Sequence, residues 1–221
     1  ASYSGGFRAP QAFDEDLHVG IVGGERVVTR LADGLKEERS HSFSLSTDLY
    51  HTFGKIQTNL LIEGFCTLLD DVFASRKLDR KDPQGNEIQE RYNAYGAKVW
   101  GVNVEGKAAF TSWFQLQAGI TLQKSRYDEA VEWDENAPKE KRMMRTPDIY
   151  GYFTATLNPM KRLTASLSGT YTGKMLVGRA GIDEGPAKRA PLAVHTPDFF
   201  TLNLKMAYDM PLYKQTTLQV N

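Results

Sequence analysis

Cysteine and net charge are the two quantities that this sequence lacks most clearly. Cys66 is the only cysteine among 221 residues, so the chain can form neither an internal disulfide nor a zinc site of the multi-cysteine kind. We expect Cys66 to be a thiol without chemistry of its own. Lys and Arg number 27, as do Asp and Glu. Because no global field attracts nucleic acid, we expect no nucleic-acid partner.

Long apolar runs are also absent. No segment approaches the ~18 apolar residues that a transmembrane helix needs. This absence excludes helical membrane spans but leaves open a membrane β-barrel, whose strands are apolar on one face only. The chain does not start with an export signal, and residues 216–221 still alternate like a strand. We therefore expect it to be a segment of a longer protein.

Strict alternation of apolar and polar residues dominates the chain. In WGVNVEGKAAF at 100–110, the even-numbered residues are apolar, whereas Asn103, Glu105 and Lys107 share the other face. Such alternation predicts a strand with one apolar and one polar face. Two further segments, at 56–68 and 149–157, carry apolar residues on both faces. The alternating segments number about eight and lie at 42–50, 56–68, 100–110, 114–123, 149–157, 163–172, 200–209 and 216–221.

The connections between these segments alternate in length. Short turns are predicted at 51–55, 111–113, 158–162 and 211–215, and long loops at 69–97, 127–147 and 173–198. In an up-and-down barrel, this parity places all tight turns on one rim and all long loops on the other. A soluble β-sandwich has no reason to keep such a parity. The fold class that we expect is therefore all-β, as part of an antiparallel transmembrane barrel.

The composition of the two faces fits a membrane barrel. The polar faces are rich in Gln, Asn, Ser and Thr, which suits a wet interior, and the apolar faces carry almost no charge. Aromatic residues also gather near the strand ends, where interfacial girdles would lie. The predicted girdle residues are Tyr50, Phe53, Trp113, Phe114, Tyr208 and Tyr213 near the short turns, and Trp100, Tyr150, Tyr152 and Tyr171 near the long loops.

Four stretches carry a family resemblance: GFRAP at 6–10, LKEERSHSFSLS at 35–46, YNAYGAKVWGVNVEG at 92–106, and the pair RTPD and HTPD at 145–148 and 195–198. In this order they resemble the C-terminal part of the barrel of TonB-dependent outer-membrane receptors, most of all those of Bacteroidetes. The resemblance implies that residues 1–221 form about eight strands of a roughly 22-stranded barrel. The plug domain and the closing strands of the family lie outside this sequence.

The resemblance also implies a function and a location. Such a protein would lie in the cell outer membrane among lipid. It would transport a scarce nutrient chelate, such as a ferric siderophore, haem or cobalamin, with energy supplied by TonB through the absent N-terminal part. No catalytic motif is present, so we expect neither an enzyme nor a cofactor. The alternatives are a passive porin or adhesin barrel and a soluble β-barrel binding protein.

Two loop regions supply the candidate ligand-binding residues. The first contains Arg8 in FRAP and the cluster Asp14, Glu15, Asp16 and His18, whose spacing matches no calcium or zinc signature, so we expect a charged external loop without a metal. The second is the 127–147 loop, which is acidic and then basic. Aromatic stacking and charge-assisted hydrogen bonds suit an anionic, ring-bearing ligand. The candidates for the extracellular mouth are Arg8, Asp14, Asp16, His18, Trp133, Arg142 and Arg145.

Overall fold

A computed structural model describes residues 1–10, 27–134, 136–179, 181, 189–210 and 216–220, and the statements below concern these residues. All regular structure in them is β, and they hold no helix of the length and apolarity needed to cross a bilayer. The all-β prediction is therefore confirmed. The strands are β1 (Ser2–Arg8), β2 (Val27–Leu31), β3 (Glu38–Phe53), β4 (Ile56–Asp70), β5 (Phe73–Lys81), β6 (Glu87–Asn93), β7 (Ala97–Thr111), β8 (Phe114–Val131), β9 (Glu140–Arg142), β10 (Ile149–Met160), β11 (Leu163–Thr172), β12 (Leu176–Arg179), β13 (Leu192–His195), β14 (Phe199–Met210) and β15 (Thr216–Val220).

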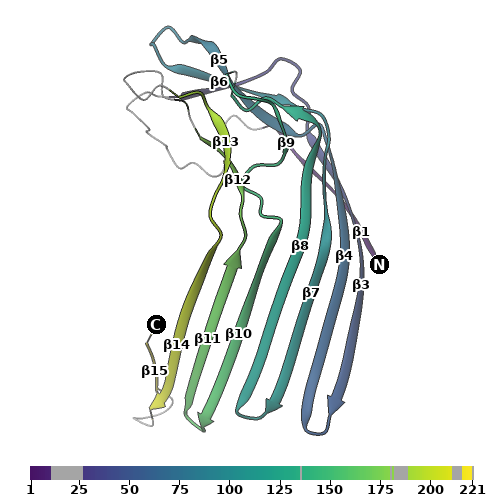
Figure 1. Cartoon of the computed structure of the whole chain (residues 1–221), viewed down its shortest axis with the longest axis vertical. Helices are drawn as coiled ribbons and strands as arrows, with labels where there is room; N and C mark the ends of the chain where they lie inside the picture. The colour runs from purple at the N-terminus through teal and green to yellow at the C-terminus, as the bar shows by residue number, and fades with distance from the viewer. Residues whose placement is uncertain (11–26, 135, 180, 182–188, 211–215, 221) are drawn as a thin grey trace.

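The largest sheet, which we call the wall, follows the order β1-β3-β4-β7-β8-β10-β11-β14-β15, with β9 paired to β8. All its neighbours are antiparallel, and Figure 1 shows the long strands side by side in one curved layer. Each of the eight predicted segments is a strand of this wall. The up-and-down order follows from the short turns, because antiparallel strands joined by two residues must be neighbours.

The turns and loops keep the predicted parity. At one end of the wall, two-residue turns join β3 to β4, β7 to β8 and β10 to β11. In the first of them Gly54 has a φ of 63°, which glycine adopts without strain. The predicted turn at 211–215, with Tyr213, lies outside the described residues. At the other end, the long connections are partly regular, since they contain β5, β6, β9, β12 and β13.

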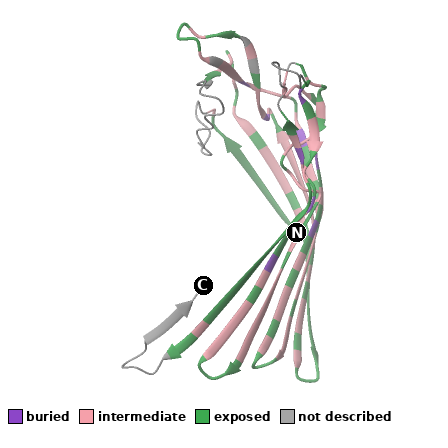
Figure 2. Cartoon of the chain, turned by 60° about the vertical axis from the view of Figure 1, so that its left-hand side comes forward, coloured by how far each residue is buried: buried purple, intermediate pink, exposed green. Residues whose placement is uncertain are grey.

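Strand register fixes which residues share a face. Phe43, Cys66, Trp100 and Lys124 are successive register partners across β3, β4, β7 and β8, so their side chains lie on one face. This outer face carries the exposed apolar residues of the wall, such as Leu45, Val102, Leu122, Leu167 and Leu204. Within the described residues, only Val72, Ala97 and Leu176 form a buried apolar core (Figure 2). The wall is therefore a single layer without a dry core of its own.

The predicted aromatic girdle is partly wrong. Tyr50 and Tyr152 pair with Asn59 and Gly119, on the polar inner face. Tyr150 lies two residues from Tyr152 and shares that face. The physical reason is the period of two, because 149–157 carries aromatic side chains on both faces and only register decides which face meets lipid. Trp100 and Tyr171 do lie on the outer face, with Cys66 and Phe200 as partners.

Candidate functional site

The long-loop end of the wall carries a second layer of structure, which we call the loop tier. It consists of the sheet β2-β6-β5, the hairpin β12–β13, the strand β9 and their connections. Figure 1 shows β5, β6, β12 and β13 at the end of the wall away from the two-residue turns. The tier is where the described chain departs most from regular alternation, and it holds the described residues of the predicted 127–147 site.

The hairpin β5–β6 is closed by one carboxylate. Asp82 accepts hydrogen bonds from the backbone N–H of Gln84 at 2.9 Å and of Asn86 at 2.7 Å, and from the side-chain amide of Asn86 at 2.8 Å. Gly85 has a φ of 85°, which suits glycine. The pKa of Asp82 lies below its usual value of 3.8, mainly because of the hydrogen bonds from Asn86. The ionised Asp82 therefore organises this turn.

A cavity of about 700 Å³ lies where β6 meets the ends of β4, β8 and β9. Its lining mixes both signs of charge with two tyrosines: Asp70, Asp71, Arg76, Tyr92, Tyr95, Glu132 and Lys139. Arg76 donates to Glu90 at 2.5 Å, and its guanidinium carbon lies 4.9 Å from the centre of the Tyr92 ring. Burial raises the pKa of Tyr92, so its phenol stays neutral and able to donate.

Asn93 holds the cavity together. Its amide oxygen accepts a hydrogen bond from the backbone N–H of Lys36 at 2.7 Å, and its amide nitrogen donates to the carbonyls of Asp71 at 2.7 Å and Lys36 at 3.1 Å. One side chain thus joins the end of β6, the segment before β3 and the residue after β4. Asp71 itself has a φ of 52°, a left-handed conformation that is uncommon outside glycine. These contacts fix the floor of the cavity.

The structure brings three predicted residues together against the hairpin β12–β13. The indole N–H of Trp133 donates to the carbonyl of Pro138 at 3.1 Å, and its ring lies on Gly178, where an added Cβ would approach it to 2.7 Å. Arg142 donates to Asp148 at 2.8 Å and lies 3.3 Å from the Nε2 atom of His195. The backbone N–H of Arg145 donates to the carbonyl of Leu176 at 2.8 Å, with a φ of 57°.

These three residues differ in how many hydrogen-bond donors remain available to a ligand. Trp133 and Arg142 are half-buried and already take part in contacts within the tier. Arg145 is exposed, and its guanidinium has no hydrogen bond or ion pair with any residue that the structure describes. Of the three, Arg145 therefore offers the most donors to a ligand, and the other two supply its surroundings.

The remaining predicted residues lie elsewhere. Arg8 ends β1, opposite Glu38, and its guanidinium carbon lies 5.7 Å from the centre of the Phe73 ring in β5. It therefore belongs with β5 and β6 rather than with β12 and β13. Asp14, Asp16 and His18 lie outside the described residues, so their predicted place in the mouth stays a prediction.

Sequence reasoning missed the residues that line the cavity. Arg76, Tyr92, Tyr95 and Lys139 were not candidates, although Tyr92 and Tyr95 stand within the stretch YNAYG that carries the family resemblance. Two tyrosines three residues apart between a charge-rich segment and a regular strand are a usable signal for a binding surface. Their convergence with Lys139 depends on contacts across about fifty residues, which no local pattern reports.

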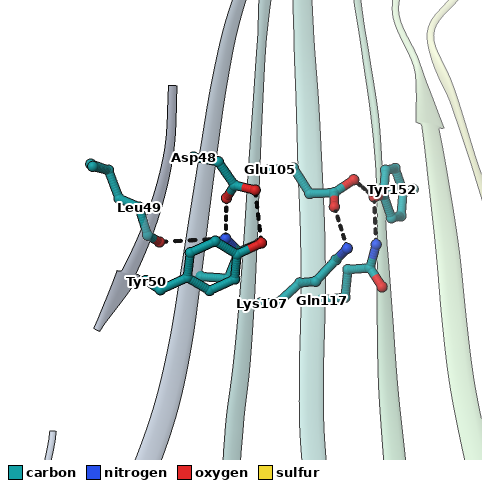
Figure 3. A network of polar contacts seen from close by, with 8 residues as sticks. Asp48, Leu49, Tyr50, Glu105, Lys107, Gln117 and Tyr152 are labelled. Carbon is teal, nitrogen blue, oxygen red and sulfur yellow. Dashed lines mark hydrogen bonds and ion pairs between the residues drawn. The ribbon is translucent and has the colours of Figure 1, made fainter. Parts of the chain in front are cut away.

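The inner face of the wall carries a ladder of polar contacts (Figure 3). Glu105 is bound by the Tyr152 hydroxyl and by the Lys107 ammonium at 2.9 Å, and Gln117 donates to the Tyr152 hydroxyl at 2.9 Å. On β3 and β4, Asp48 accepts from the Tyr50 hydroxyl at 2.8 Å and from the Asn59 amide. Charged and polar groups thus satisfy one another without a buried core, as expected for a face that meets water.

The chemistry open to these surfaces is recognition. Among the described residues, no group of three or more His, Cys, Asp or Glu is placed to hold a metal ion. The cavity offers two phenols, two cations and three carboxylates, and the inner face offers amides and hydroxyls. Such a set suits a polar ligand that is held by several charge-assisted hydrogen bonds.

A comparison with protein families identifies the architecture. Residues 1–221 match the model of the family described as TonB dependent receptor-like, beta-barrel. No curated protein sequence matches the chain. The match covers both the wall and the loop tier.

Solved structures with a similar fold share little sequence. The FrpB iron transporter from Neisseria meningitidis (F3-3 variant) is 16% identical with a TM-score of 0.52, over 85% of this chain and 26% of that one. The ferripyoverdine receptor of the outer membrane of Pseudomonas aeruginosa is 14% identical with a TM-score of 0.56, over 93% and 24%. The copper transporter OprC is 11% identical with a TM-score of 0.60, over 98% and 29%. The chain thus spans about a quarter of the length of these structures.

Proposed function

The chain belongs to the TonB-dependent receptor-like β-barrel family, and on that premise we propose that it forms part of an energy-driven receptor that imports a nutrient metal chelate. The protein lies in the outer membrane, where this family resides. We further propose that residues 1–221 are the C-terminal part of the barrel, with a plug domain supplied by the rest of the protein. Coupling to TonB would then pass through that plug.

The loop tier is the observation that carries the proposal. It places Arg145, the Trp133 ring and a cavity of about 700 Å³ on the rim that bears the long loops. The inner face of the wall, below that rim, is mainly polar near its centre, where Asp48, Glu105 and Lys107 lie beside the apolar Leu61. A charged ligand could therefore be captured at the rim and passed along a surface that does not require its desolvation.

The names of the similar structures support the chemical class. They describe an iron transporter, a copper transporter and a receptor bound to ferripyoverdine. We propose a metal chelate that carries negative charge, because the exposed Arg145 and the nearby Lys139 and Lys141 are cations. Anionic ferric siderophores and haem are the candidates that fit this charge, and cobalamin, which has no net negative charge, is the third candidate. We also propose Arg8, Asp14, Asp16 and His18 as contributors to the same rim.

A binding and uptake experiment tests the function. The full-length receptor is produced in outer membranes and probed with radio-iron as catecholate and hydroxamate chelates, haem and cobalamin. We expect one probe to bind and to enter the cell only while the proton-motive force is maintained. Binding should weaken by roughly tenfold or more in Trp133→Ala combined with Arg145→Ala, since each charge-assisted contact contributes about 1.5–3 kcal/mol.

The control is Lys205→Ala, which removes a cation from the inner face of β14, where Lys205 pairs with Ser166. It should leave affinity at the rim unchanged. Uptake that persists after the proton-motive force is dissipated would contradict active transport and indicate a passive barrel. Unchanged affinity in the double variant would remove the 127–147 loop from the site.

A further inference from the structure

Three basic residues stand in register on neighbouring strands at the long-loop end of the wall. Lys98 on β7 is the register partner of Arg126 on β8, and Arg126 is the partner of Arg142 on β9. We call these three the basic row. Adjacent strands lie about 4.8 Å apart, and like charges directly opposite each other destabilise a sheet. A row of three cations therefore needs negative charge nearby.

Among the residues that the structure describes, carboxylates form ion pairs only with the two ends of the basic row. The Lys98 ammonium lies 2.9 Å from Asp128, and the Arg142 guanidinium lies 2.8 Å from Asp148. Arg126, in the middle, is exposed, and no described residue forms a hydrogen bond or an ion pair with it. Lys124, two residues along the same face of β8, is likewise exposed and without a described partner.

The basic row lies on the outer face, at the upper limit of the apolar surface. Lys124 is the register partner of Trp100, which is 40% exposed, and Trp100 in turn pairs with Cys66. The next pair on the same face, Val102 and Leu122, is exposed and fully apolar. In a membrane barrel, aromatic residues mark the depth at which acyl chains give way to headgroups. The unpaired cations thus stand at headgroup depth.

We propose that Lys124, Arg126 and Lys98 bind the phosphate of an anionic lipid headgroup in the leaflet that surrounds the long-loop rim. Arg presents a planar fork of donors that matches phosphate oxygens, and Lys adds a point charge beside it. The bound phosphate offsets the repulsion within the basic row, and the acyl chains of the same lipid lie against Val102 and Leu122. Asp128 and Asp148 stay with the cations at the two ends of the row.

This site depends on the outer-membrane location and not on the transported ligand. An experiment that refutes the lipid site therefore leaves the proposed function untouched, and the reverse also holds. A lipid site would be lost without any change in chelate uptake, and a wrong substrate assignment would leave lipid binding intact.

The test compares lipid binding by variants of the full-length receptor in detergent. Wild type, Lys124→Gln with Arg126→Gln, and the control Lys205→Gln are titrated with diphosphoryl lipid A, with the same lipid stripped of phosphate, and with inorganic phosphate. Bound lipid is counted by native mass spectrometry, and folding is checked by heat-modifiable migration in gels. We expect wild type and Lys205→Gln to bind the phosphorylated lipid roughly tenfold more tightly than the stripped lipid.

The double variant should lose that preference while remaining folded. Equal binding of both lipids by wild type would overturn the proposal, as would an equal loss in Lys205→Gln, which would indicate an effect of total charge. Competition by inorganic phosphate at the lipid's own concentration would indicate a free-anion site and would likewise overturn it. A further variant, Arg126→Lys, keeps the charge and should retain part of the preference, because only the forked geometry is lost.

Discussion

The wall and the loop tier are held together by different interactions. In the wall, long antiparallel strands satisfy one another's backbone groups over up to fifteen register partners in a single pair, β3 with β4. In the tier, strands of three to nine residues depend on particular side chains, such as Asp82, Asn93 and Trp133. The wall therefore depends mainly on which face each residue occupies, whereas the tier depends on particular side chains.

The largest change that we expect in the free energy of unfolding distinguishes the outer face of the wall from its inner face. Leu204→Arg places a charge on the outer face at a residue that is 60% exposed in the described chain and would face acyl chains in the membrane. It should lower the free energy of unfolding of the intact barrel by roughly 2–4 kcal/mol near the bilayer midplane. Ser168→Arg, on the inner face opposite Asn203, should have a small effect.

Urea unfolding of both variants in lipid vesicles gives the comparison. Leu167→Arg, at the register partner of Leu204, should behave like Leu204→Arg. Equal tolerance of arginine at all three positions would mean that the apolar face does not meet lipid.

A smaller effect should be confined to the loop tier. Gly178→Val introduces a side chain whose Cβ would lie 2.7 Å from the Trp133 ring, and such overpacking costs typically about 1–3 kcal/mol. Because the contact lies within the tier, we expect faster proteolysis of the 127–147 loop and a shifted Trp133 emission, with unchanged unfolding of the wall. The matched control is Gly64→Val, since an added Cβ at Gly64 meets no atom within 4 Å.

Removing one hydrogen bond from the polar ladder of the inner face should lower the stability of the wall by a similar or smaller amount. Tyr152→Phe removes the hydroxyl that donates to Glu105 and accepts from Gln117. A typical hydrogen bond contributes about 0.5–1.5 kcal/mol, and somewhat more when one partner is charged. Tyr150→Phe is the control, because the Tyr150 hydroxyl has no described partner. If the two variants unfold at the same urea concentration, the ladder does not stabilise the wall.

The smallest effect depends on pH and concerns the turn between β5 and β6. The pKa of Asp82 is lowered, mainly by its hydrogen bonds from Asn86. Its stabilisation is therefore present above the usual value of 3.8 and is lost as the pH falls through the lower value of the folded state. Amide hydrogen exchange at Gln84 and Asn86 should thus accelerate, relative to the intrinsic rate, in strong acid. Asp82→Ala should show fast exchange at every pH, and an identical pH profile in both proteins would refute this role.

The wall could be predicted from the sequence because a period of two is a strong local signal. The segment 100–110 shows it without interruption, and its register with 114–123 follows from the short turn that joins them. Tyr50 follows Ser46 and Asp48 in the same period of two, so its polar face could have been predicted. The face of Tyr150 and Tyr152 could not, because aromatic residues occur on both faces of 149–157 and only the register with Gly119 decides which face they share.

The loop tier could be predicted only in part. Trp133, Arg142 and Arg145 belong to one loop of mixed charge, which the sequence shows plainly. Their common neighbour is the hairpin β12–β13, whose strands of four residues are too short for a periodic signal. The contacts with it join residues roughly thirty to fifty positions apart. The pairing of β2 with β6 is parallel and spans about sixty residues, so it too depends on tertiary contacts rather than on local pattern.

Asn93 links the loop tier to the wall. Its one amide bonds to the backbone just before β3 and just after β4, so residue 93 ties the position of the β5–β6 hairpin to the loop end of these two strands. The tier is therefore not a set of independent flaps. Asn93→Ala should loosen this tie, while the backbone still joins β4 to β5 and β6 to β7.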